Sequence, residues 1–305
     1  SIVAADPASG EVGVAVASRF FAVGSVVPYA RAGVGAVASQ ASANTTYGPR
    51  GLELLAGGAS PAEALAILTR ADKGQSQRQA GVVAADGASA TFTGPECNAW
   101  AGGRSGPGYA VQGNILTGEA VVAAMEKVLL ERAGKPRAER LYAALAAGDA
   151  AGGDSRGKQS AVLLVSRAGG GYGGKDDRAI DIRVDDHAEP IVELGRLVDL
   201  ALVNDLWNRG WAAFRDGKRG EDLKWQEMTL AKAEATRAGI LPEVLYDTAV
   251  IRILFDTGVS PVSNVVVVTR RTERRDQLSR AFGRDANVVL DGGGGVALDD
   301  DVRVV

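Results

Sequence analysis

Residues 1–20 read SIVAADPASGEVGVAVASRF, and this stretch decides the fold. Two apolar runs, at residues 2–5 and 12–17, flank a turn at residues 6–10 that contains Pro7. An apolar run, a turn with proline and glycine, and a second apolar run together predict a β-hairpin. Both runs are apolar at consecutive positions rather than at alternating ones, which predicts a sheet that is covered on both faces.

The segments that follow predict strands and helices in separate runs. Ser60, Pro61 and Glu63 have the spacing of an N-cap, a first helical residue and a capping-box partner, so we expect a helix to begin there. Such runs are typical of the α+β class rather than of a repeated strand-helix-strand array. The predicted strands are residues 23–30, 33–38, 80–84, 89–92, 109–112, 160–165 and 179–184, and the predicted helices are residues 48–69 with a break at 57–58, 118–132, 136–147 and one from about residue 190.

The character of the sequence changes in its last third. Trp207, Trp211 and Phe214 recur at helical spacing, and residues 224–237 and 242–255 are typical of helices. Two helical hairpins about 35 residues apart predict a tetratricopeptide-like (TPR-like) array, although residues 265–268 are a β-branched run where such an array would need a helix. The predicted domains are residues 1–202, a helical repeat-like domain at residues 203–290, and a loose Gly- and Asp-rich tail at residues 291–305.

The composition of the 305 residues excludes several classes of site. There is one His and one Cys, which excludes a multi-histidine zinc site, an internal disulfide and a thiolate zinc cluster, and we expect no metal and no cofactor. The net charge of -3 gives no basic excess for nucleic acid, and no apolar stretch approaches the roughly 20 residues that span a bilayer. The cysteine usage fits a reducing compartment, so we expect a cytoplasmic protein. We expect it to bind neither nucleic acid nor a membrane, and we also expect a homodimer or a higher homo-oligomer.

The first residue is Ser1, and no initiator Met precedes it. One interpretation is that the sequence simply starts after a tag or a disordered stretch. The other is that cleavage of a precursor exposes this serine, whose hydroxyl and free α-amine then supply a nucleophile and a base in one residue. An α-amine has an ordinary pKa of about 7.7–8.0, so it can accept the hydroxyl proton directly or through one water. Such a base would replace the histidine that the composition nearly lacks.

Residues at the ends of two predicted strands are candidates to complete such a site. The predicted hairpin places Arg19 near Ser1, where a cation would keep the amine neutral; a surface ion pair is the alternative. Gln112, Gly113 and Asn114 end a strand ahead of a helix. Gly113 lets the backbone approach a substrate closely, and the Asn114 amide can donate two hydrogen bonds, so we expect substrate binding and an oxyanion hole here. The alternative is a turn in which Asn114 caps the helix.

Polar residues in two loops are further candidates for substrate binding. Gln40 and Asn44 lie in the polar segment after the strand at residues 33–38, and their amides suit substrate recognition. Asp154 and Arg156 lie in a loop flanked by glycines. We expect Arg156 to bind substrate and Asp154 to orient the Ser1 ammonium or a substrate amine, the alternative being an Asp that only forms a turn.

Other motifs favour structural interpretations. His187 follows two aspartates, but adjacent strand residues point to opposite faces, so we expect a cap or a hydrogen bond rather than a metal ligand. Cys97 has no His near it in the sequence, which makes a thiol nucleophile less favoured than the serine. Residues 33–38 fit a dinucleotide-binding glycine pattern, but no helix opens at the glycines. The glycine-rich stretch at residues 169–174 is typical of a hairpin loop.

Six segments of the chain together resemble the bacterial family DUF1028, which is placed among the N-terminal-nucleophile (Ntn) hydrolases. The resemblance runs from residue 1 to about residue 202 and implies a four-layer αββα sandwich and the hydrolysis of amide bonds. Family members usually read Thr-Phe-Ser or Thr-Trp-Ser at the start, which implies that self-cleavage removes a short leader ahead of Ser1. The segments are residues 1–7, 13–20, 47–51, 111–114, 152–160 and 185–187.

These observations predict an Ntn-type amidohydrolase that cleaves a carbon–nitrogen bond in a small-molecule amide. A linear amide, a lactam or a small peptide-like compound would fit this chemistry. The alternative is a non-catalytic protein of the same fold, whose C-terminal helical domain binds a peptide or a cell-wall partner.

Overall fold

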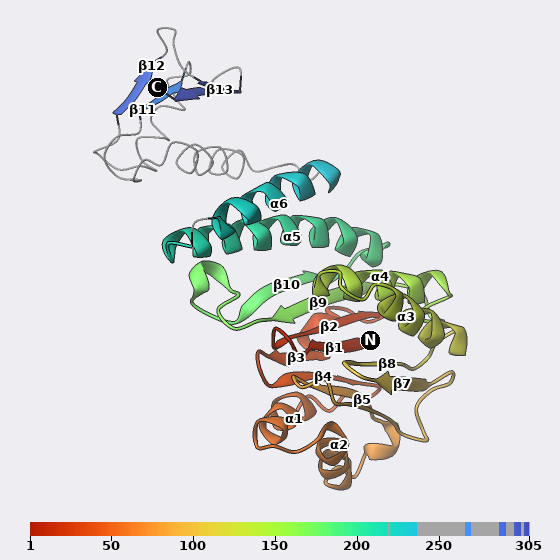
Figure 1. The fold of residues 1–305 in the computed structure, drawn as a ribbon. Coiled ribbons are helices and arrows are strands. Elements are labelled where there is room, and N and C mark those ends of the chain that lie inside the picture. Colours follow the sequence, from red (N-terminus) through yellow and green to blue (C-terminus); the bar gives the residue numbers. More distant parts are fainter. Residues whose placement is uncertain (219, 237–265, 270–286, 291–295, 300–301, 305) are drawn as a thin grey trace. The chain divides into compact units, whose positions relative to one another are not determined.

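The structure is a computed structural model, and it describes residues 1–218, 220–236, 266–269, 287–290, 296–299 and 302–304. The chain divides into two compact units, Ser1–Asn208 and Arg209–Val305. The first unit contains the predicted hairpin, drawn in red in Figure 1.

The hairpin forms the middle of a six-stranded antiparallel sheet with the order β10-β9-β2-β1-β8-β7. Ile2 pairs with Ala15 on one side and with Val111 on the other, so the predicted hairpin is confirmed. The strands are β1 (Ile2–Asp6), β2 (Glu11–Ser18), β7 (Gly102–Gly106), β8 (Tyr109–Gly113), β9 (Ser160–Ser166) and β10 (Arg178–Val184).

A second, four-stranded antiparallel sheet has the order β3-β4-β5-β6. Its strands follow one another along the chain, so each is joined to its neighbour without a crossover. They are β3 (Pro28–Arg31), β4 (Gly35–Gln40), β5 (Gln79–Ala84) and β6 (Ser89–Thr93).

Five α-helices complete the first unit, with α5 continuing past its end. The predicted capping box is present, because the Ser60 side chain accepts from the Glu63 backbone and the Glu63 side chain accepts from the Ser60 backbone. The helices are α1 (Tyr47–Ala56), α2 (Pro61–Arg70), α3 (Glu119–Glu131), α4 (Arg137–Ala150) and α5 (Pro190–Arg215), with short 3-10 turns η1 (Val23–Ser25), η2 (Gln75–Gln77) and η3 (Tyr172–Gly174).

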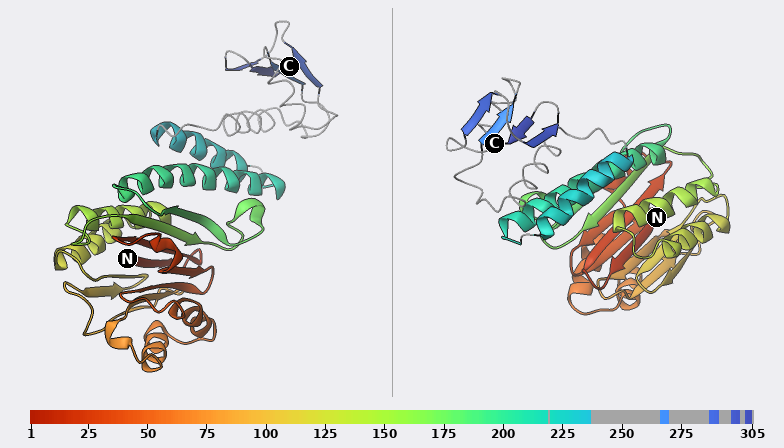
Figure 2. Two further views of the ribbon diagram at one scale, coloured as in Figure 1. Left: turned by 180° about the vertical axis from the view of Figure 1, so that it is seen from behind. Right: turned by 45° about the horizontal axis from the view of Figure 1, so that its top comes forward.

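Three apolar cores hold these elements together. One lies between α3, α4, the start of α5 and the first sheet, one lies between the two sheets, and one lies between the second sheet and helices α1 and α2. Along β1, Ile2 and Ala4 belong to the helix-covered core, whereas Val3 and Ala5 belong to the core between the sheets. The layers therefore stack as helices, sheet, sheet and helices (Figures 1 and 2). The mixed α+β class and the two-sided covering of the hairpin are confirmed.

Two glycines let the sheets meet around Gln112 of β8. A Cβ atom on Gly81 of β5 would overlap the Gln112 amide, and one on Gly103 of β7 would lie 2.9 Å from the Gln112 Cβ. Gln112 is fully buried as a result. The absence of side chains at these two positions thus admits a polar side chain between the sheets.

Two parts of the first unit differ from the sequence-based prediction. Residues 23–30 do not form one strand, because Val23–Ser25 is a 3-10 turn in which Gly24 packs closely against Val162 and Arg183. Strand β7 was not predicted, since its sequence Gly-Gly-Arg-Ser-Gly has a low intrinsic strand preference. Pairing with β8 overrides that preference.

The second unit combines helix and sheet in its described residues. Helix α6 (Glu221–Thr236) matches the predicted helix at residues 224–237, and Arg209 lies over the ring of Trp225 at 5.3 Å from its centroid. The described strands form a sheet with the order β12-β11-β14-β13, which includes one parallel pair. They are β11 (Val266–Thr269), β12 (Asn287–Leu290), β13 (Val296–Asp299) and β14 (Val302–Val304).

These strands are a correction to the purely helical extension and the loose tail that we expected for residues 203–290 and 291–305. Their valine-rich, β-branched runs favour extended backbone over helix, which the helical spacing upstream does not reveal. The second predicted helix of the TPR-like array, at residues 242–255, lies outside the described residues.

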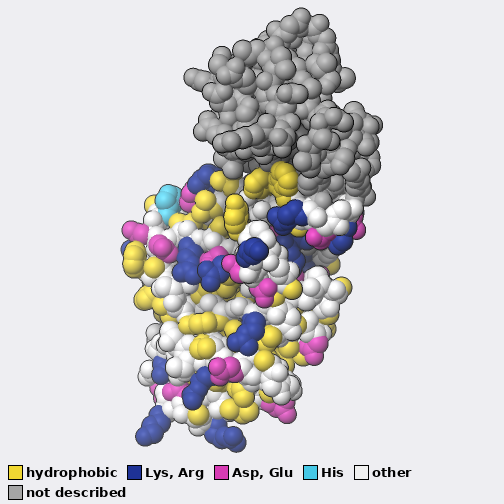
Figure 3. Space-filling model, turned by 90° about the vertical axis from the view of Figure 1, so that its left-hand side faces the viewer, with side chains coloured by type: hydrophobic (Ala, Val, Ile, Leu, Met, Phe, Trp, Pro, Cys, Tyr) yellow, Lys and Arg dark blue, Asp and Glu magenta, His cyan; other side chains and the backbone are white. Residues whose placement is uncertain are grey.

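Basic and acidic side chains are interspersed on the face of the molecule that Figure 3 presents. The described helices include none with the length and apolar character needed to cross a bilayer.

Candidate functional site

A cavity of about 520 Å³ opens in the first unit beside Ser1. Its walls come from the ends of β2, β4 and β8, from the segment between β2 and β3, from α3 and α4, from the loop at residues 153–158 and from the start of α5. All predicted site residues except Arg19 and Asn44 line it. Segments that are distant in the sequence are therefore brought together here.

Ser1 lies at the start of β1, in the middle of the first sheet. Its backbone carbonyl accepts a hydrogen bond of 3.0 Å from the backbone N–H of Gln112. The register that pairs Ile2 with Ala15 and Val111 puts Ser1 beside Val16 and Gln112. Because side chains alternate along a strand and Ile2 faces the helices, the Ser1 hydroxyl faces the layer between the sheets.

Gln112 makes every hydrogen bond that is described for the Ser1 amine and hydroxyl. The Ser1 amine donates to the Gln112 carbonyl oxygen at 2.8 Å, and the Gln112 Nε2 donates to the Ser1 Oγ at 2.6 Å. The Ser1 Oγ also lies 3.5 Å from the Gln112 carbonyl oxygen. Both the amine and the hydroxyl of Ser1 are thus held by one residue of the neighbouring strand.

Burial lowers the pKa of the Ser1 α-amine from 8.0 to about 5. The amine is therefore neutral at pH 7 and keeps a lone pair that can accept a proton. Desolvation alone accounts for this shift. The cation that we expected to keep the amine neutral is not required.

The Gln112 side chain is held by packing rather than by a second hydrogen bond. Its Oε1 atom is buried and has no hydrogen-bond partner among the described residues. Gly81 faces this amide, so there is no room for it to swing toward the second sheet. The amide N–H is consequently aimed at the Ser1 hydroxyl by the shape of the surrounding core.

A second buried amide, Gln79, forms hydrogen bonds with several residues that line the cavity. Its Nε2 donates to the Gly113 carbonyl at 2.8 Å and to the Thr93 hydroxyl at 2.9 Å. Its Oε1 accepts from Gln40 Nε2 at 2.6 Å and from Asn114 Nδ2 at 3.3 Å. Both predicted amides, at positions 40 and 114, line the cavity, and the Asn114 Nδ2 retains a second hydrogen.

Gln79 was missed by sequence reasoning, although a signal for it exists. It opens the apolar run Gln79-Ala80-Gly81-Val82-Val83, in which a fully buried polar side chain is unexpected. Buried polar groups nearly always have hydrogen-bond partners, so a glutamine at the start of a buried strand indicates a polar network.

Charged side chains from the end of α4 and from the loop at residues 153–158 line the cavity in ion pairs. Asp154 accepts from Arg156 at 2.7 Å, and Lys158 lies 2.9 Å from Asp149. Burial raises the pKa of Asp154, but the hydrogen bonds from Arg156 outweigh it and leave this pKa below its ordinary value. Asp154 is thus a carboxylate paired with Arg156, and no hydrogen bond between Asp154 and the Ser1 amine is described. The predicted role of Asp154 in binding a substrate amine stays a prediction.

Arg19 and Asn44 lie away from the cavity. The Arg19 guanidinium donates to the Lys158 carbonyl at 2.9 Å, and its backbone N–H donates to Asp154 at 3.1 Å. Asn44 donates to Asp72 at 2.9 Å and accepts from the Thr46 hydroxyl at 2.7 Å. Strand β2 ends at Ser18, so Arg19 lies outside the strand and the strand pairing does not fix the direction of its side chain. Arg19 therefore holds the loop at residues 153–158, and Asn44 holds the segment before α1, but neither residue lines the cavity.

The remaining motifs have structural roles. His187 Nδ1 accepts from the Glu189 backbone N–H at 3.0 Å, just before α5, as the expected cap-like bond. Burial raises the pKa of the Cys97 thiol, and its sulfur donates to the Arg78 carbonyl. Residues 33–38 form the β3–β4 turn and part of β4, so no helix follows these glycines. The described residues contain no cluster of side chains suited to a metal ion.

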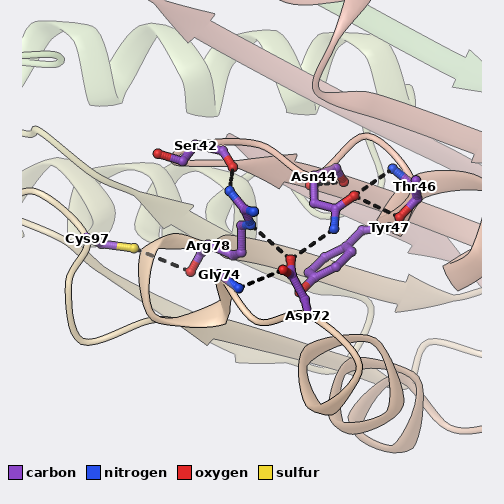
Figure 4. Close-up of polar contacts among 9 residues, drawn as sticks. Ser42, Asn44, Thr46, Tyr47, Asp72, Gly74, Arg78 and Cys97 are labelled. Atoms are coloured by element: carbon purple, nitrogen blue, oxygen red, sulfur yellow. Dashed lines mark hydrogen bonds and ion pairs between the residues drawn. The ribbon is translucent and has the colours of Figure 1, made fainter.

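Figure 4 shows the hydrogen-bonded cluster that holds one rim of the cavity. Asp72 accepts from Arg78 Nε and Asn44 Nδ2, each at 2.9 Å, and from the Tyr47 hydroxyl at 3.1 Å. Arg78 in turn donates to the Ser42 carbonyl. Ser42 and its neighbour Ala41 line the cavity with φ angles of 46° and 54°, a left-handed conformation that costs free energy for residues with a Cβ. The cluster therefore stabilises a strained segment of the rim.

Comparison with known proteins supports a single family. The chain matches DUF1028, described as a family of unknown function, over residues 1–194, which lie within the first unit. A crystal structure of a DUF1028 protein from Silicibacter pomeroyi is 31% identical, with a TM-score of 0.60 over 66% of this chain and 84% of that one. No curated protein matches the chain.

Asp72→Asn is expected to destabilise the first unit by about 2 kcal/mol, because it weakens several hydrogen bonds to a charged group. The hydrogen bond from Arg78 holds the pKa of Asp72 well below its ordinary value of 3.8. Its folded-state pKa is thus the lower one, so its contribution is present above about pH 4 and is lost as the pH falls further. Urea unfolding at pH 7 and at pH 3 measures both effects.

Glu53→Gln on the exposed face of α1 is the control for Asp72→Asn and should leave stability nearly unchanged. Equal stability of Asp72→Asn and the wild-type protein at pH 7 would contradict a stabilising role for this cluster.

Proposed function

The chain belongs to the DUF1028 family through residues 1–194, and we propose that the first unit is an amidohydrolase of the N-terminal-nucleophile type. Ser1 is the nucleophile once its α-amine is free. The observation that carries this proposal is the pairing of a neutral, buried α-amine with a hydroxyl that Gln112 holds at 2.6 Å, at the edge of an open cavity.

The layered arrangement of helices, sheet, sheet and helices supports the assignment to the Ntn fold. The nucleophile begins a central strand, β1, which has β2 on one side and β8 on the other. A central strand is rigid because both of its edges are hydrogen-bonded. Ser1 is consequently fixed at its carbonyl while its amine and hydroxyl reach the cavity.

In the first half of the reaction, the neutral Ser1 amine takes the proton from the Ser1 hydroxyl as the oxygen attacks the carbonyl carbon of the substrate. The tetrahedral intermediate collapses when the protonated amine gives that proton to the leaving nitrogen. The carbon–nitrogen bond breaks, the amine product departs, and an ester to Ser1 remains. Water, activated by the same amine, then attacks the ester and releases the carboxylic acid and the free Ser1 hydroxyl.

Amide groups at the site supply the donors that this reaction needs. Gln112 holds the hydroxyl oxygen in position through its Nε2. Asn114 uses one amide hydrogen on Gln79 and offers the other to the cavity. Fixed donors in a buried site stabilise an oxyanion far more than mobile donors in water do.

A related reaction would release the Ser1 amine from a preceding residue. The Ser1 hydroxyl would attack the carbonyl carbon of that residue while a water molecule takes the hydroxyl proton, because the acylated Ser1 nitrogen is not basic. The carbon–nitrogen bond would break, the nitrogen would take up a proton as the free amine, and water would then hydrolyse the resulting ester. Self-cleavage and substrate hydrolysis would then use the same nucleophile and the same oxyanion donors.

The central test is Ser1→Ala in protein expressed with a leader ahead of position 1. We expect the leader to remain attached, as intact mass spectrometry would show, and hydrolysis of a panel of acyl anilides to fall by at least about 10³-fold. Ser9→Ala, in the exposed turn of the hairpin, is the control and should be processed and active. Full activity of Ser1→Ala would end the proposal.

Gln112→Met keeps the size of the side chain but removes the N–H that contacts the hydroxyl. We expect kcat to fall by about 10²-fold with a smaller change in KM, because the lost interaction acts on the reacting atoms. Gln77→Met, at an exposed position, serves as the control. An unchanged kcat for Gln112→Met would show that this amide does not assist the reaction.

The pH dependence of kcat/KM reports the amine of the free enzyme. Because burial lowers the pKa of the Ser1 amine to about 5, activity is expected to be full at pH 7 and to fall as the pH drops through about 5. An exposed α-amine would instead give a fall centred near its ordinary pKa of 8.0. A fall in kcat/KM that is centred near pH 8 would therefore contradict a buried, neutral base.

A further inference from the structure

The lining of the cavity contains both ion-paired and apolar side chains. Asp149, Asp154, Arg156 and Lys158 line it, and each acid among them has a basic partner. An apolar part of the lining, here called the apolar wall, comes from β2 and from the segment between β2 and β3, and it consists of Val16, Val23, Val26, Val27 and Phe20. Further apolar residues of the lining come from α3, α4 and the start of α5. A substrate that enters this cavity can therefore contact both kinds of surface.

The apolar wall lies on the same side of the first sheet as the nucleophile. The strand register places Val16 beside Ser1, and Val16 belongs to the core between the two sheets, which the Ser1 hydroxyl also faces. Val23 and Val27 belong to that same core and are almost fully buried. A carbonyl carbon held at the Ser1 hydroxyl would therefore have this apolar surface next to it.

Hydrogen bonds fix the segment that forms most of this wall. The fully buried Ser160 accepts from the Val23 N–H at 3.1 Å and donates to the Phe20 carbonyl at 2.5 Å. The Val27 carbonyl accepts from the Ser39 N–H at 3.1 Å. The wall is thus shaped before any ligand arrives, and a preformed apolar surface binds without a large cost of ordering.

Phe20 marks the outer end of the wall. It lines the cavity and is 51% exposed, whereas the adjacent Phe21 is 63% exposed and does not line it. A large apolar ring that stays half in solvent at a cavity mouth loses its remaining contact with water when an apolar group covers it. This position suits the far end of an extended hydrocarbon group.

We propose that this apolar wall, made of Val16, Val23, Val26, Val27 and Phe20, is an acyl slot that selects amides of uncharged aliphatic acids. The inference rests on Ser1 as the attacking group, since that role places the acyl carbon beside Val16. A charged acyl group would lose its hydration against this apolar surface, and the acids and bases that line the cavity are already ion-paired with one another.

The test uses ketones, which carry the carbonyl and the alkyl chain but no leaving group. Calorimetric titration of the wild-type protein with 2-butanone, 2-pentanone, 2-hexanone and 2-heptanone should give a Kd that tightens by up to about fourfold per methylene until the slot is full. The charged analogue 4-oxopentanoate should bind at least about tenfold more weakly than 2-hexanone. A Kd that does not change with chain length, or equal binding of the charged analogue, would overturn the proposal.

Two variants locate the slot. Phe20→Ala should raise the Kd of 2-heptanone several-fold and should change the Kd of 2-butanone little. Phe21→Ala should change neither Kd. Val26→Phe, at a half-buried position, should shorten the longest chain that still gains affinity. Equal effects of Phe20→Ala and Phe21→Ala would count against the slot.

Turnover separates the slot from the proposed activity. If ketones bind as expected but no acyl anilide is hydrolysed, the slot stands and the amidohydrolase proposal falls. If anilides are hydrolysed at a rate independent of acyl length, the activity stands and the slot falls.

Discussion

The close approach of the two sheets at Gln112 is the contact on which the rest of the site depends. Gly81 and Gly103 leave space for one glutamine side chain, and no larger residue fits at Gly81 without displacing the amide. Since protein cores are packed as densely as organic crystals, the amide has one position, and that position directs its N–H to Ser1 Oγ. The hydroxyl of the first residue is thereby oriented by the spacing of two sheets.

Gln79 likewise fixes other residues of the cavity lining from a buried position between the sheets. This one fully buried side chain joins Gln40 at the end of β4, Thr93 on β6, and the Gly113 carbonyl and the Asn114 side chain at the end of β8. Uncharged amides thus tie both sheets together at the edge where the cavity opens. A satisfied buried network of this kind is rigid, because breaking any one bond leaves a polar group without a partner.

The parts of the fold that could be predicted from sequence are those with a strong local signal, such as the β1–β2 hairpin and the Ser60 capping box of α2. Strand β7 could not be, because five residues rich in glycine take their conformation from β8. The candidate residues Ser1, Gln112 and Asn114 were found because their residue types suit the chemistry. The direction of Arg19 and the partners of Gln79 depend on contacts between distant segments, so a local pattern such as the polar residue at the start of an apolar run can mark Gln79 but cannot name its partners.

The buried amine at Ser1 ties the folding of the first unit to proton release. An exposed α-amine in the unfolded chain has a pKa of 8.0, while the folded one has a pKa of about 5, so folding at pH 7 expels nearly one proton. By linkage this costs about 1.4 kcal/mol at pH 7, and the cost disappears as the pH rises above about 8. A chain in which Ser1 is still joined to a preceding residue has no such amine and is spared the cost. Release of a free amine at Ser1 would therefore make the folded protein less stable and more sensitive to acid.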